Sequence, residues 1–514
     1  MMRKIAAAIS IASDGVYMNL SERHADSIKR IEYLFHPLNL GQDTFNKGKI
    51  SFGKVEKLCT ILNNYRRVLK EYHVKDYRVV STTALREARN SIYILDQIKS
   101  RTKFDVEVLD DNQEKSYIYR LMLMKLERDN FNAKHAFLAY IGTGSLGIAL
   151  YKNGRIVYSQ NIRIGSLKLT ELLRNFQDNS QQFHIIIKEY LSSFVQTIET
   201  IPDLKNVKHF LTCGQEIDNI VKLCGKASPK TRQKIRVKDF RELFEEIKVK
   251  TPEQLSKAYN LPEHHTEVLL PSIGIYNMLF DIVKVDPIVA VPVTLTESLL
   301  HEMLKNKGFE RITQSLSESS VIEARNLGSR FLYDEQHAAQ VESFSLQIFD
   351  SLKKVHRLGK TERHLLQIGA ILHDVGKFIQ LKYHSKHSSN IIKETELLGL
   401  NQRELSIVAS IVKYHSIRYF DFDEVEIQKL DQRDTLIISK LLAILRLADA
   451  LDRAHSNKVT QIKLTLKEQE FLITAFASKK ILLEKWALDI KSEFFEDVFG
   501  LKVRVKRGDP IGLR

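Results

Sequence analysis

The first three hundred residues combine two patterns of hydrophobic and polar positions. Short apolar runs at Lys4–Ala12, Tyr77–Ser81 and Ile156–Ile164 have the length of buried strands. Phe52–Tyr72 instead places its apolar side chains at a period near 3.6 residues, which is typical of an amphipathic helix. Strands that alternate with helices in this way predict an α/β architecture.

Beyond about residue 306 the strand pattern gives way to helical periodicity. Amphipathic helices are predicted at His337–Leu352, Glu362–Leu372, Arg403–His415 and Thr435–His455. The C-terminal end changes again, because Gln461–Leu466 and Phe471–Phe476 alternate like strands and Ile481–Phe494 is helical. This succession predicts a multidomain fold: an α/β part, an all-α part and a small α+β domain.

The charge and cysteine content narrow the partners and the compartment. The 514 residues carry a formal charge of +15, which favours polyanions such as polyphosphate or a phosphorylated nucleotide. General solubility is the alternative, because the basic residues are scattered, and we expect no specific nucleic-acid partner. Cys59, Cys213 and Cys224 form no paired framework and suit the reducing cytoplasm. No apolar run approaches the roughly 20 residues of a membrane span, so we expect no membrane segment.

The motif His373-Asp374-Val375-Gly376-Lys377 follows an apolar helix and is the most informative chemical pattern in the chain. A histidine and an aspartate side by side need partners when they are buried. An imidazole nitrogen and a carboxylate oxygen together suit a borderline or hard divalent metal ion. The predicted metal ligands are His337, His373, Asp374, His387, His415 and Asp449.

This order of histidines and aspartates resembles the HD superfamily of metal-dependent phosphohydrolases. The resemblance implies one or two divalent ions per chain, Mg, Mn or Fe, and catalytic roles for His373, Asp374 and Lys377. Lys377 is placed to neutralise charge on a phosphate, and Arg446 adds positive charge for substrate binding. The alternative for Lys377 is a solvated cation at a helix end.

A second segment resembles another family. Ser81–Asn90 reads Ser-Thr-Thr-Ala-Leu-Arg-Glu-Ala-Arg-Asn, close to the pattern Ala-Thr-Ser-Ala-Leu-Arg-Glu-Ala-Arg-Asn of the Ppx/GppA exopolyphosphatases and guanosine-pentaphosphate phosphohydrolases. This resemblance implies two actin-like (ribonuclease H-like, ASKHA) lobes, at residues 1–125 and 126–305, around a phosphate-binding cleft. It also implies a helical HD domain at 320–460, a small α+β domain at 461–514, and a homodimer.

The expected cleft departs from the family pattern at its acidic positions. Ser10, Tyr140 and Gly147 stand where the phosphate loops of the family carry acidic residues. Gln113 stands where a glutamate activates water, and a glutamine cannot accept the proton. Three interpretations remain open: a degenerate binding pocket, an active site whose base has moved to Glu114 or a nearby aspartate, and a purely structural pair of lobes.

Some groups that hold phosphate remain in this half of the chain. The predicted substrate-binding residues are Arg86, Arg89, Gly142, Gly144 and Ser145. Backbone N–H groups of a glycine-rich turn cradle phosphate oxygens, and arginines bind polyanions. An ion pair with Glu87 or Glu114 is the alternative role of the two arginines.

These patterns predict a cytoplasmic hydrolase that resembles exopolyphosphatases and acts on polyphosphate, guanosine penta- or tetraphosphate, or a nucleotide. Hydrolysis is expected at the HD metal site rather than in the degenerate cleft. Two alternatives remain open: exopolyphosphatase activity retained in the actin-like cleft, and a non-catalytic regulator that binds polyphosphate or an alarmone.

Overall fold

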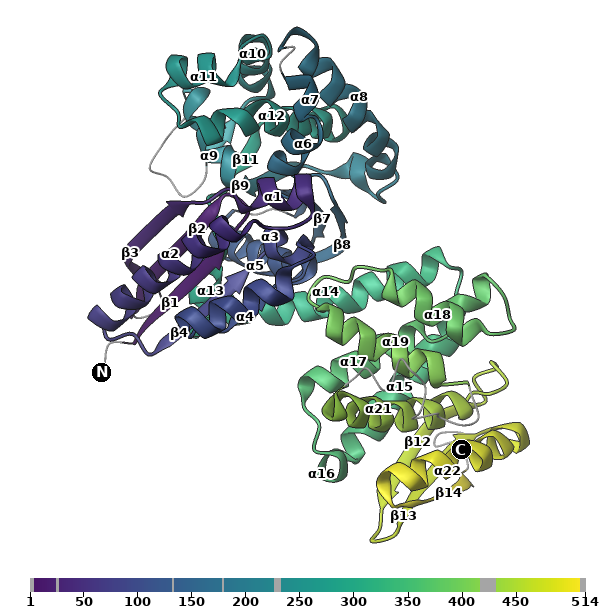
Figure 1. The fold of residues 1–514 in the computed structure, drawn as a ribbon. Coiled ribbons are helices and arrows are strands. Elements are labelled where there is room, and N and C mark those ends of the chain that lie inside the picture. Colours follow the sequence, from purple (N-terminus) through teal and green to yellow (C-terminus); the bar gives the residue numbers. More distant parts are fainter. Residues whose placement is uncertain are drawn as a thin grey trace. The chain divides into compact units, whose positions relative to one another are not determined.

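The structure, a computed structural model, describes residues 4–24, 27–131, 134–177, 180–225, 233–416 and 431–508. The chain divides into two compact units, Met1–Ser319 and Ser320–Arg514 (Figure 1). The division falls within the long helix α14 (Lys307–Arg330).

The first sheet of the N-terminal unit has the strand order β3-β2-β1-β4-β5. Its strands are β1 (Ile5–Ile11), β2 (Gly15–His24), β3 (Ser27–Pro37), β4 (Asp76–Ser81) and β5 (Val106–Val108). Strands β1, β2 and β3 pair antiparallel, whereas β1, β4 and β5 pair parallel. The helices of this region are α1 (Leu40–Lys47), α2 (Phe52–Glu71), α3 (Thr83–Glu87), α4 (Ser91–Thr102) and α5 (Asp111–Arg128).

Strand β1 is buried on both faces, which explains its alanine-rich sequence. Ala7 and Ile9 belong to one hydrophobic cluster, and Ala6 and Ala8 belong to another on the opposite face. All four side chains are fully buried. Small residues therefore let helices pack closely against both faces of the sheet.

The second sheet repeats the order of the first and adds one edge strand: β10-β11-β9-β6-β7-β8. Its strands are β6 (His135–Ile141), β7 (Leu146–Lys152), β8 (Arg155–Ile162), β9 (His209–Gly214), β10 (Gln233–Ile235) and β11 (Ile288–Ala290). Strands β6, β7 and β8 pair antiparallel, and β6, β9 and β11 pair parallel. The predicted phosphate loops are therefore the equivalent β1–β2 and β6–β7 turns of two similar lobes.

Helices cover the second sheet and continue the chain. They are α6 (Ser166–Leu172), α7 (Arg174–Gln177), α8 (Ser180–Glu199), η1 (Leu204–Asn206), α9 (Gln215–Leu223), α10 (Val237–Ile247), α11 (Pro252–Tyr259), α12 (Glu263–Val283) and α13 (Leu295–Met303). In the described part of the chain one helical stretch, His264–Val283, is long and apolar enough to cross a membrane. Because 72% of that stretch is buried in the structure, it also has the features of a core helix.

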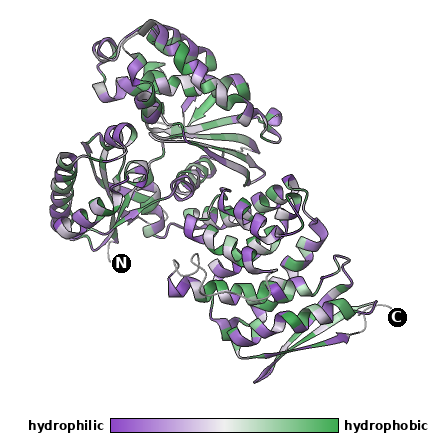
Figure 2. Ribbon diagram, turned by 45° about the vertical axis from the view of Figure 1, so that its right-hand side comes forward, coloured by the Kyte–Doolittle hydropathy of each residue, from purple (hydrophilic) through white to green (hydrophobic). Residues whose placement is uncertain are grey.

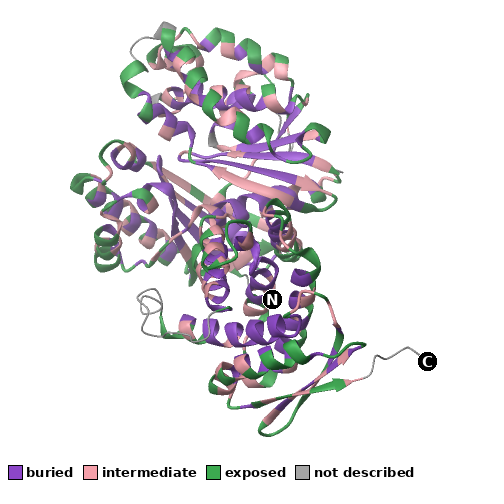
Figure 3. Cartoon of the chain, turned by 90° about the vertical axis from the view of Figure 1, so that its right-hand side faces the viewer, coloured by how far each residue is buried: buried purple, intermediate pink, exposed green. Residues whose placement is uncertain are grey.

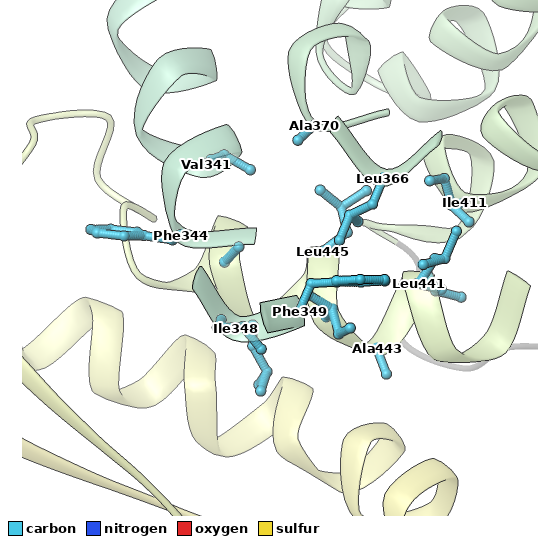
Figure 4. Packing of buried hydrophobic residues seen from close by; sticks show 14 of the residues in the cluster. Val341, Phe344, Ile348, Phe349, Leu366, Ala370, Ile411, Leu441, Ala443 and Leu445 are labelled. Carbon is cyan, nitrogen blue, oxygen red and sulfur yellow. The ribbon is translucent and has the colours of Figure 1, made fainter. Parts of the chain in front are cut away.

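The C-terminal unit begins with a bundle of helices. They are α15 (Glu335–Ser351), α16 (Lys353–His356), α17 (Lys360–Leu372), η2 (Val375–Phe378), α18 (His384–Lys393), α19 (Gln402–Tyr414) and α21 (Gln432–Ala450). Figure 4 shows side chains of α15, α17, α19 and α21 packed together, among them Phe349, Leu366, Ile411 and Leu445. Every residue of α21 from Leu441 to Ala450 is buried, so a charged side chain there is removed from water.

Helix α21 ends earlier than its apolar pattern predicted. The predicted helix runs to His455, but α21 ends at Ala450. The carboxylate of Asp452 accepts hydrogen bonds from the backbone N–H groups of Ser456 and Asn457, at 3.2 and 2.8 Å. Such side-chain bonds to the backbone compete with the helix and fix a turn.

The chain closes with a three-stranded sheet and one helix. The elements are β12 (Val459–Leu466), β13 (Glu470–Ala477), α22 (Leu482–Phe499) and β14 (Lys502–Gly508), in the sheet order β12-β13-β14. Val459, Phe471 and Phe495 belong to the same hydrophobic cluster as the bundle, and α22 packs on α21. The helical and α+β parts therefore share one core.

The predicted α/β multidomain fold, with a helical region and a small C-terminal sheet, is confirmed. Figure 2 shows hydrophobic residues along the strands and hydrophilic ones on the outward sides of the helices. Figure 3 shows the matching burial: many strands of the N-terminal unit and the inward helix faces are buried, whereas exposed residues lie on outer helix faces, on loops and on strands such as β12 and β14. The domain boundaries near residues 125 and 460 stay predictions.

Candidate functional site

Four histidines and two aspartates from different helices converge inside the C-terminal unit. They are His337 on α15, His373 at the end of α17, Asp374 before η2, His384 at the start of α18, His415 after α19, and Asp449 on α21. Helix α17 ends at the pair because Asp374 leaves helical geometry, with φ −109° and ψ 2°. The side chains then point from the ends of several helices to one place.

The first group of ligand atoms surrounds His337 and His373. Their Nε2 atoms lie 3.2 Å apart. Asp449 Oδ1 lies 3.5 Å from His337 Nε2 and 3.8 Å from His373 Nε2. Asp374 Oδ2 lies 3.7 and 3.4 Å from the same two nitrogens. Two imidazoles and two carboxylates thus face one another across a very short distance.

The second group lies on the other oxygen of the same carboxylate. Asp374 Oδ1 lies 3.3 Å from His384 Nε2 and 3.7 Å from His415 Nε2. Asp374 therefore faces one histidine pair with each oxygen. Asp374 could therefore supply one oxygen to each of two groups of metal ligands.

The second nitrogen of each histidine fixes its protonation pattern. The four Nδ1 atoms lie 2.7–3.0 Å from oxygens that can only accept a hydrogen bond. These acceptors are Asp452 Oδ2 for His337 and the carbonyl oxygens of Ala370, Leu381 and Val412 for His373, His384 and His415. Each Nδ1 must therefore carry a proton and donate it, as is usual for histidines that bind a metal.

With the proton on Nδ1, a neutral ring presents a lone pair at Nε2, and His337, whose pKa is raised to about 9, presents one once it has lost its second proton. These lone pairs point at the oxygens of Asp374 and Asp449, which are also electron-rich. Such an arrangement is repulsive unless a cation lies among the atoms. The donor set therefore fits a divalent ion better than it fits an empty polar core.

The titration of the buried groups supports this conclusion. Burial lowers the pKa of His373 to about 3, so this ring is neutral. Against the effect of burial, the surrounding positive groups hold the pKa of Asp374 and of Asp449 well below the usual range. Burial also opposes the charge of His337, but hydrogen bonds to Asp449 and Asp452 raise its pKa to about 9. In the metal-free protein a proton on His337 supplies part of the positive charge.

The imidazole nitrogens and carboxylate oxygens of the centre are the ligand types that bind Zn, Mn and Fe. They differ from a site made of oxygen ligands alone. All six ligand side chains except His384 are nearly inaccessible, and the side chain of His384 is 20% exposed. The edge of the centre at His384 is therefore its most accessible part among the described ligands. Lys377, with a side chain 32% exposed, lies there and pairs with Asp374 Oδ2 at 2.5 Å.

The structure differs from the predicted ligand set at one position. His384, rather than His387, brings its Nε2 to Asp374. His387 contributes no atom to either candidate group of ligands among the described residues. The reason is local: the Cβ of His387 lies against Gly376 of the turn that follows Asp374, where it fills space beside η2.

Arg446 lies in a different place from the one its predicted role requires. Its side chain is 1% exposed, and its guanidinium lies over the ring of Phe494, 5.3 Å from the centroid. Burial lowers its pKa. This position favours packing between α21 and α22 over contact with a substrate phosphate.

The sequence did not single out three further residues of the centre. Asp452 orients His337, and His455 stacks on the His337 ring at a centroid distance of 3.6 Å. Lys491 on α22 forms an ion pair with Asp449. Asp452 could have been found from its spacing, one helical turn after Asp449. Lys491 carries no local signal, because it lies in the C-terminal α+β part.

The N-terminal unit contains a separate cavity of about 300 Å³ between its two phosphate-loop turns. Its lining includes Ser10, Asp14 and Thr82 from one lobe and Tyr140, Gly142, Thr143 and Asp218 from the other, together with Glu114. Tyr17, Tyr33 and Phe35 add aromatic rings. Among the described lining residues there is no lysine or arginine, and the basic His265 already pairs with Glu216 at 3.2 Å, so a bare polyanion meets mainly carboxylates here.

The structure places Glu114, not Gln113, in this cavity. Gln113 closes a capping box with Asp110 at the start of α5: its N–H donates to Asp110 Oδ1 at 2.8 Å, and its Oε1 accepts from the Asp110 N–H at 3.0 Å. The carboxylate of Glu114 accepts a hydrogen bond from the Tyr140 hydroxyl at 3.0 Å. The predicted candidate base thus lies one residue beyond the position taken from the family pattern.

The predicted phosphate ligands of the cleft are mostly engaged with the protein itself. Arg86 pairs with Asp111 at 2.6 Å and with Glu114 at 3.4 Å, which favours the internal ion pair. Arg89 is exposed, and its side chain packs at Gly48. The N–H of Gly142 donates to the carbonyl of Ser145 at 2.9 Å. Gly144 lies so close to Thr83 that a Cβ there would come within 2.3 Å of its methyl carbon.

Family profiles identify both units. The profile of the Ppx/GppA phosphatase family matches residues 21–307, and that of Ppx/GppA phosphatase, domain III, matches residues 321–496. The chain belongs to the Ppx/GppA phosphatase family. It is therefore a hydrolase of the family that contains exopolyphosphatases and guanosine-pentaphosphate pyrophosphatases, as its sequence predicted.

Individual relatives are distant. The chain is 19% identical to a guanosine-5'-triphosphate,3'-diphosphate pyrophosphatase of Photobacterium profundum, over 91% of each chain. It is also 19% identical to a protein of the same name from Aeromonas hydrophila, over 86% of each chain. Among solved structures, an Aquifex aeolicus Ppx/GppA family member has a TM-score of 0.51 at 20% identity and covers 59% of this chain and 99% of its own. A Cytophaga hutchinsonii exopolyphosphatase has a TM-score of 0.52 at 18% identity, and the match covers 59% of this chain and 98% of the exopolyphosphatase chain. These two structures show the fold alone.

There is no room for a side chain at Gly376 of the His-Asp motif. Its substitution therefore tests whether the following helix α18 brings His384 to the centre. A Cβ at this position would come within 2.2 Å of the His384 carbonyl oxygen and 2.3 Å of the Ser388 nitrogen. Because these are backbone atoms, Gly376→Ala must displace the start of α18 and with it His384. We expect a loss of about 1–3 kcal/mol in unfolding free energy, as for other overpacked sites, and a loss of bound metal measured by elemental analysis.

Gly359→Ala is the control in the same unit, because a Cβ there would meet only the flexible carboxylate of Glu362, at 3.2 Å. Unchanged metal content in folded Gly376→Ala protein would contradict the placement of His384 in the centre.

The raised pKa of His337 predicts the pH dependence of metal binding. Below a pH of about 9 the ring carries a proton that an incoming ion must displace. The apparent affinity should therefore rise with pH by up to roughly tenfold per pH unit and level off above that pKa. Titration calorimetry with Mn²⁺ in buffers of different ionisation enthalpy measures the proton released.

Asp452→Asn removes the negative charge of one of the hydrogen-bond acceptors that raise the pKa of His337, so the pH at which the affinity levels off should be lower. Affinity that does not change with pH in the native protein would contradict the assignment of His337.

Proposed function

We propose that this Ppx/GppA-family hydrolase cleaves a phosphoanhydride or phosphoester bond at the metal centre of its C-terminal unit. The observation that carries the proposal is the convergence of four imidazole Nε2 atoms on the two oxygens of Asp374, with Asp449 beside two of them. The order of these residues also resembles the HD superfamily, with His384 as the first histidine after the His-Asp pair.

The protein residues would hold two ions in two groups. His337, His373 and Asp449 form the first group, His384 and His415 form the second, and Asp374 belongs to both. Bound divalent ions would supply Lewis-acid activation of water and of the phosphate. The protein fixes the orientation of each imidazole through its Nδ1–H, which keeps the ligand nitrogens aimed at the centre.

Lys377 and His455 lie at the partly exposed edge of the centre and are placed to bind substrate. Lys377 donates a hydrogen bond to His455 Nε2 at 3.2 Å, and His455 Nδ1 lies 3.2 Å from Asp334. A metal ion bound to Asp374 would neutralise the carboxylate charge in place of Lys377. The ammonium group would then be free to pair with a phosphate oxygen.

The names of the relatives suggest the substrate class. Two of them are guanosine-5'-triphosphate,3'-diphosphate pyrophosphatases and one solved structure is an exopolyphosphatase. We propose polyphosphate, a guanosine penta- or tetraphosphate, or another phosphorylated nucleotide as the substrate of this chain. The formal charge of +15 supports an anionic substrate.

Hydrolysis in the interlobe cavity is the second candidate, and the position of Glu114 favours it. Glu114 lines the cavity and is 7% exposed. However, its two oxygens already accept a hydrogen bond from Tyr140 and pair with Arg86. A base that is engaged in this way abstracts a proton less readily than a free one.

Two substitutions separate the candidates. His373→Ala should reduce phosphate release by at least roughly 10²-fold, since metal-assisted catalysis depends on the residues that hold the metal. Glu114→Gln should change it by less than roughly tenfold, which is below the contribution of a general base. Phosphate release is measured on polyphosphate, guanosine pentaphosphate and nucleotides with Mg, Mn and Fe.

His364→Ala is the matched control for His373→Ala. His364 lies on the same helix, α17, but its Nε2 bonds to the Ser320 hydroxyl at 2.8 Å, outside the centre. An active His373→Ala protein together with an inactive Glu114→Gln protein would assign the chemistry to the interlobe cavity instead.

A further inference from the structure

A lysine from the C-terminal α+β part reaches the metal centre. Lys491 on α22 forms an ion pair with Asp449 Oδ2 on α21. Lys491 is 9% exposed and Asp449 is 3% exposed. Lysine is almost never buried to this extent unless it is paired. The contact therefore joins two parts of the chain that are separate in sequence but share one core.

The position of Lys491 on its helix is set by packing. Ala487 and Leu488, one turn earlier, and Phe495, one turn later, are buried on the same face of α22. This face packs against α21. Lys491 thus lies on the buried face of α22 among apolar residues, and helix packing alone does not account for its charge.

The ion pair divides the two oxygens of Asp449 between two tasks. Oδ2 pairs with the ammonium group of Lys491, whereas Oδ1 faces His337 Nε2 at 3.5 Å and His373 Nε2 at 3.8 Å. With Lys491 in place, Asp449 can offer only Oδ1 to the first group. Without Lys491, the carboxylate could rotate or use both oxygens.

We propose that Lys491 is a positioning residue of the metal centre. It holds the carboxylate of Asp449 so that a single oxygen joins the ligand group of His337 and His373, and it makes α22 part of the hydrolase site. This role rests on the proposed metal centre. Residues that orient a metal ligand through a hydrogen bond typically contribute roughly 10–100-fold to metal affinity or activity.

A merely structural ion pair makes a different prediction. If Lys491 only joins α22 to α21, its substitution lowers stability but leaves the affinity of the folded protein for metal unchanged. If it positions Asp449, the affinity of the first group falls while that of the second, formed by His384 and His415, is kept. Metal affinity therefore separates the two roles.

The experiment is a calorimetric titration of Mn²⁺ into the metal-stripped full-length protein. For Lys491→Met we expect one of two binding events to weaken by roughly 10–100-fold and the other to stay as in the native protein. Lys491→Arg keeps the charge and the donor groups and should restore most of the affinity. Equal affinities of the native and Lys491→Met proteins would overturn the proposal.

Lys458→Met is the matched control. Lys458 pairs at 3.0 Å with Glu484, a fully buried acid on the same helix α22, but neither residue contacts the centre in the described contacts. Its substitution should lower stability and leave both Mn²⁺ affinities unchanged. A loss of Mn²⁺ affinity in Lys458→Met as large as that in Lys491→Met would assign the effect to the packing of α22 and overturn the proposal.

Lys491→Met leaves the buried carboxylate of Asp449 without its ion-pair partner, and the variant protein then fails to fold in the least favourable case. A double-mutant cycle covers that case. Asp449→Asn removes the buried charge, so Asp449→Asn/Lys491→Met contains no unpaired ion. The proposal predicts that Lys491→Met has no further effect on Mn²⁺ affinity in this background. A further loss there would contradict it. Native protein that binds no Mn²⁺ at all would refute the metal centre itself, a result distinct from equal affinities.

Discussion

The buried carboxylate of Asp374 is the constraint on which the helical unit depends. Its side chain is 8% exposed and lies within 3.7 Å of four imidazole nitrogens. A buried charge is tolerated only when positive groups surround it. Helices α15, α17, α18 and α19 each end or begin at this point, so the packing of these helices determines the geometry of the centre. The tight turn at Gly376 lets the start of α18 approach Asp374 closely.

The two units provide different surroundings for a phosphorylated substrate. The interlobe cavity of the N-terminal unit contains Asp14, Glu114 and Asp218 and, among its described lining residues, no lysine or arginine. The centre of the C-terminal unit combines carboxylates with imidazoles and with Lys377 at its edge. Among the described residues, the second arrangement combines a candidate metal site with a lysine at its edge, whereas the first presents no lysine or arginine to an anion. This contrast explains why we assign the chemistry to the second unit of a family member whose first unit keeps the actin-like strand order.

Much of the fold and of the centre could be predicted from the sequence, and the exceptions have physical causes. The helical periodicity and the His-Asp pair identified five of the six converging residues. His384 and His387 could not be distinguished, because both lie in the first turn of one helix and only the turn at Gly376 decides between them. Gln113 and Glu114 differ by one residue, and the Asp110–Gln113 capping box, visible in the sequence, fixes which one faces the cavity. Lys491 could not be found, because a tertiary contact of α22 with α21 places it.

The most direct test of this account is to locate the metal by anomalous diffraction from crystals soaked in Mn²⁺. We expect two peaks per chain, one among His337, His373 and Asp449 and one between His384 and His415, with Asp374 next to both. Peaks only in the interlobe cavity, or no peak at these residues, would contradict it.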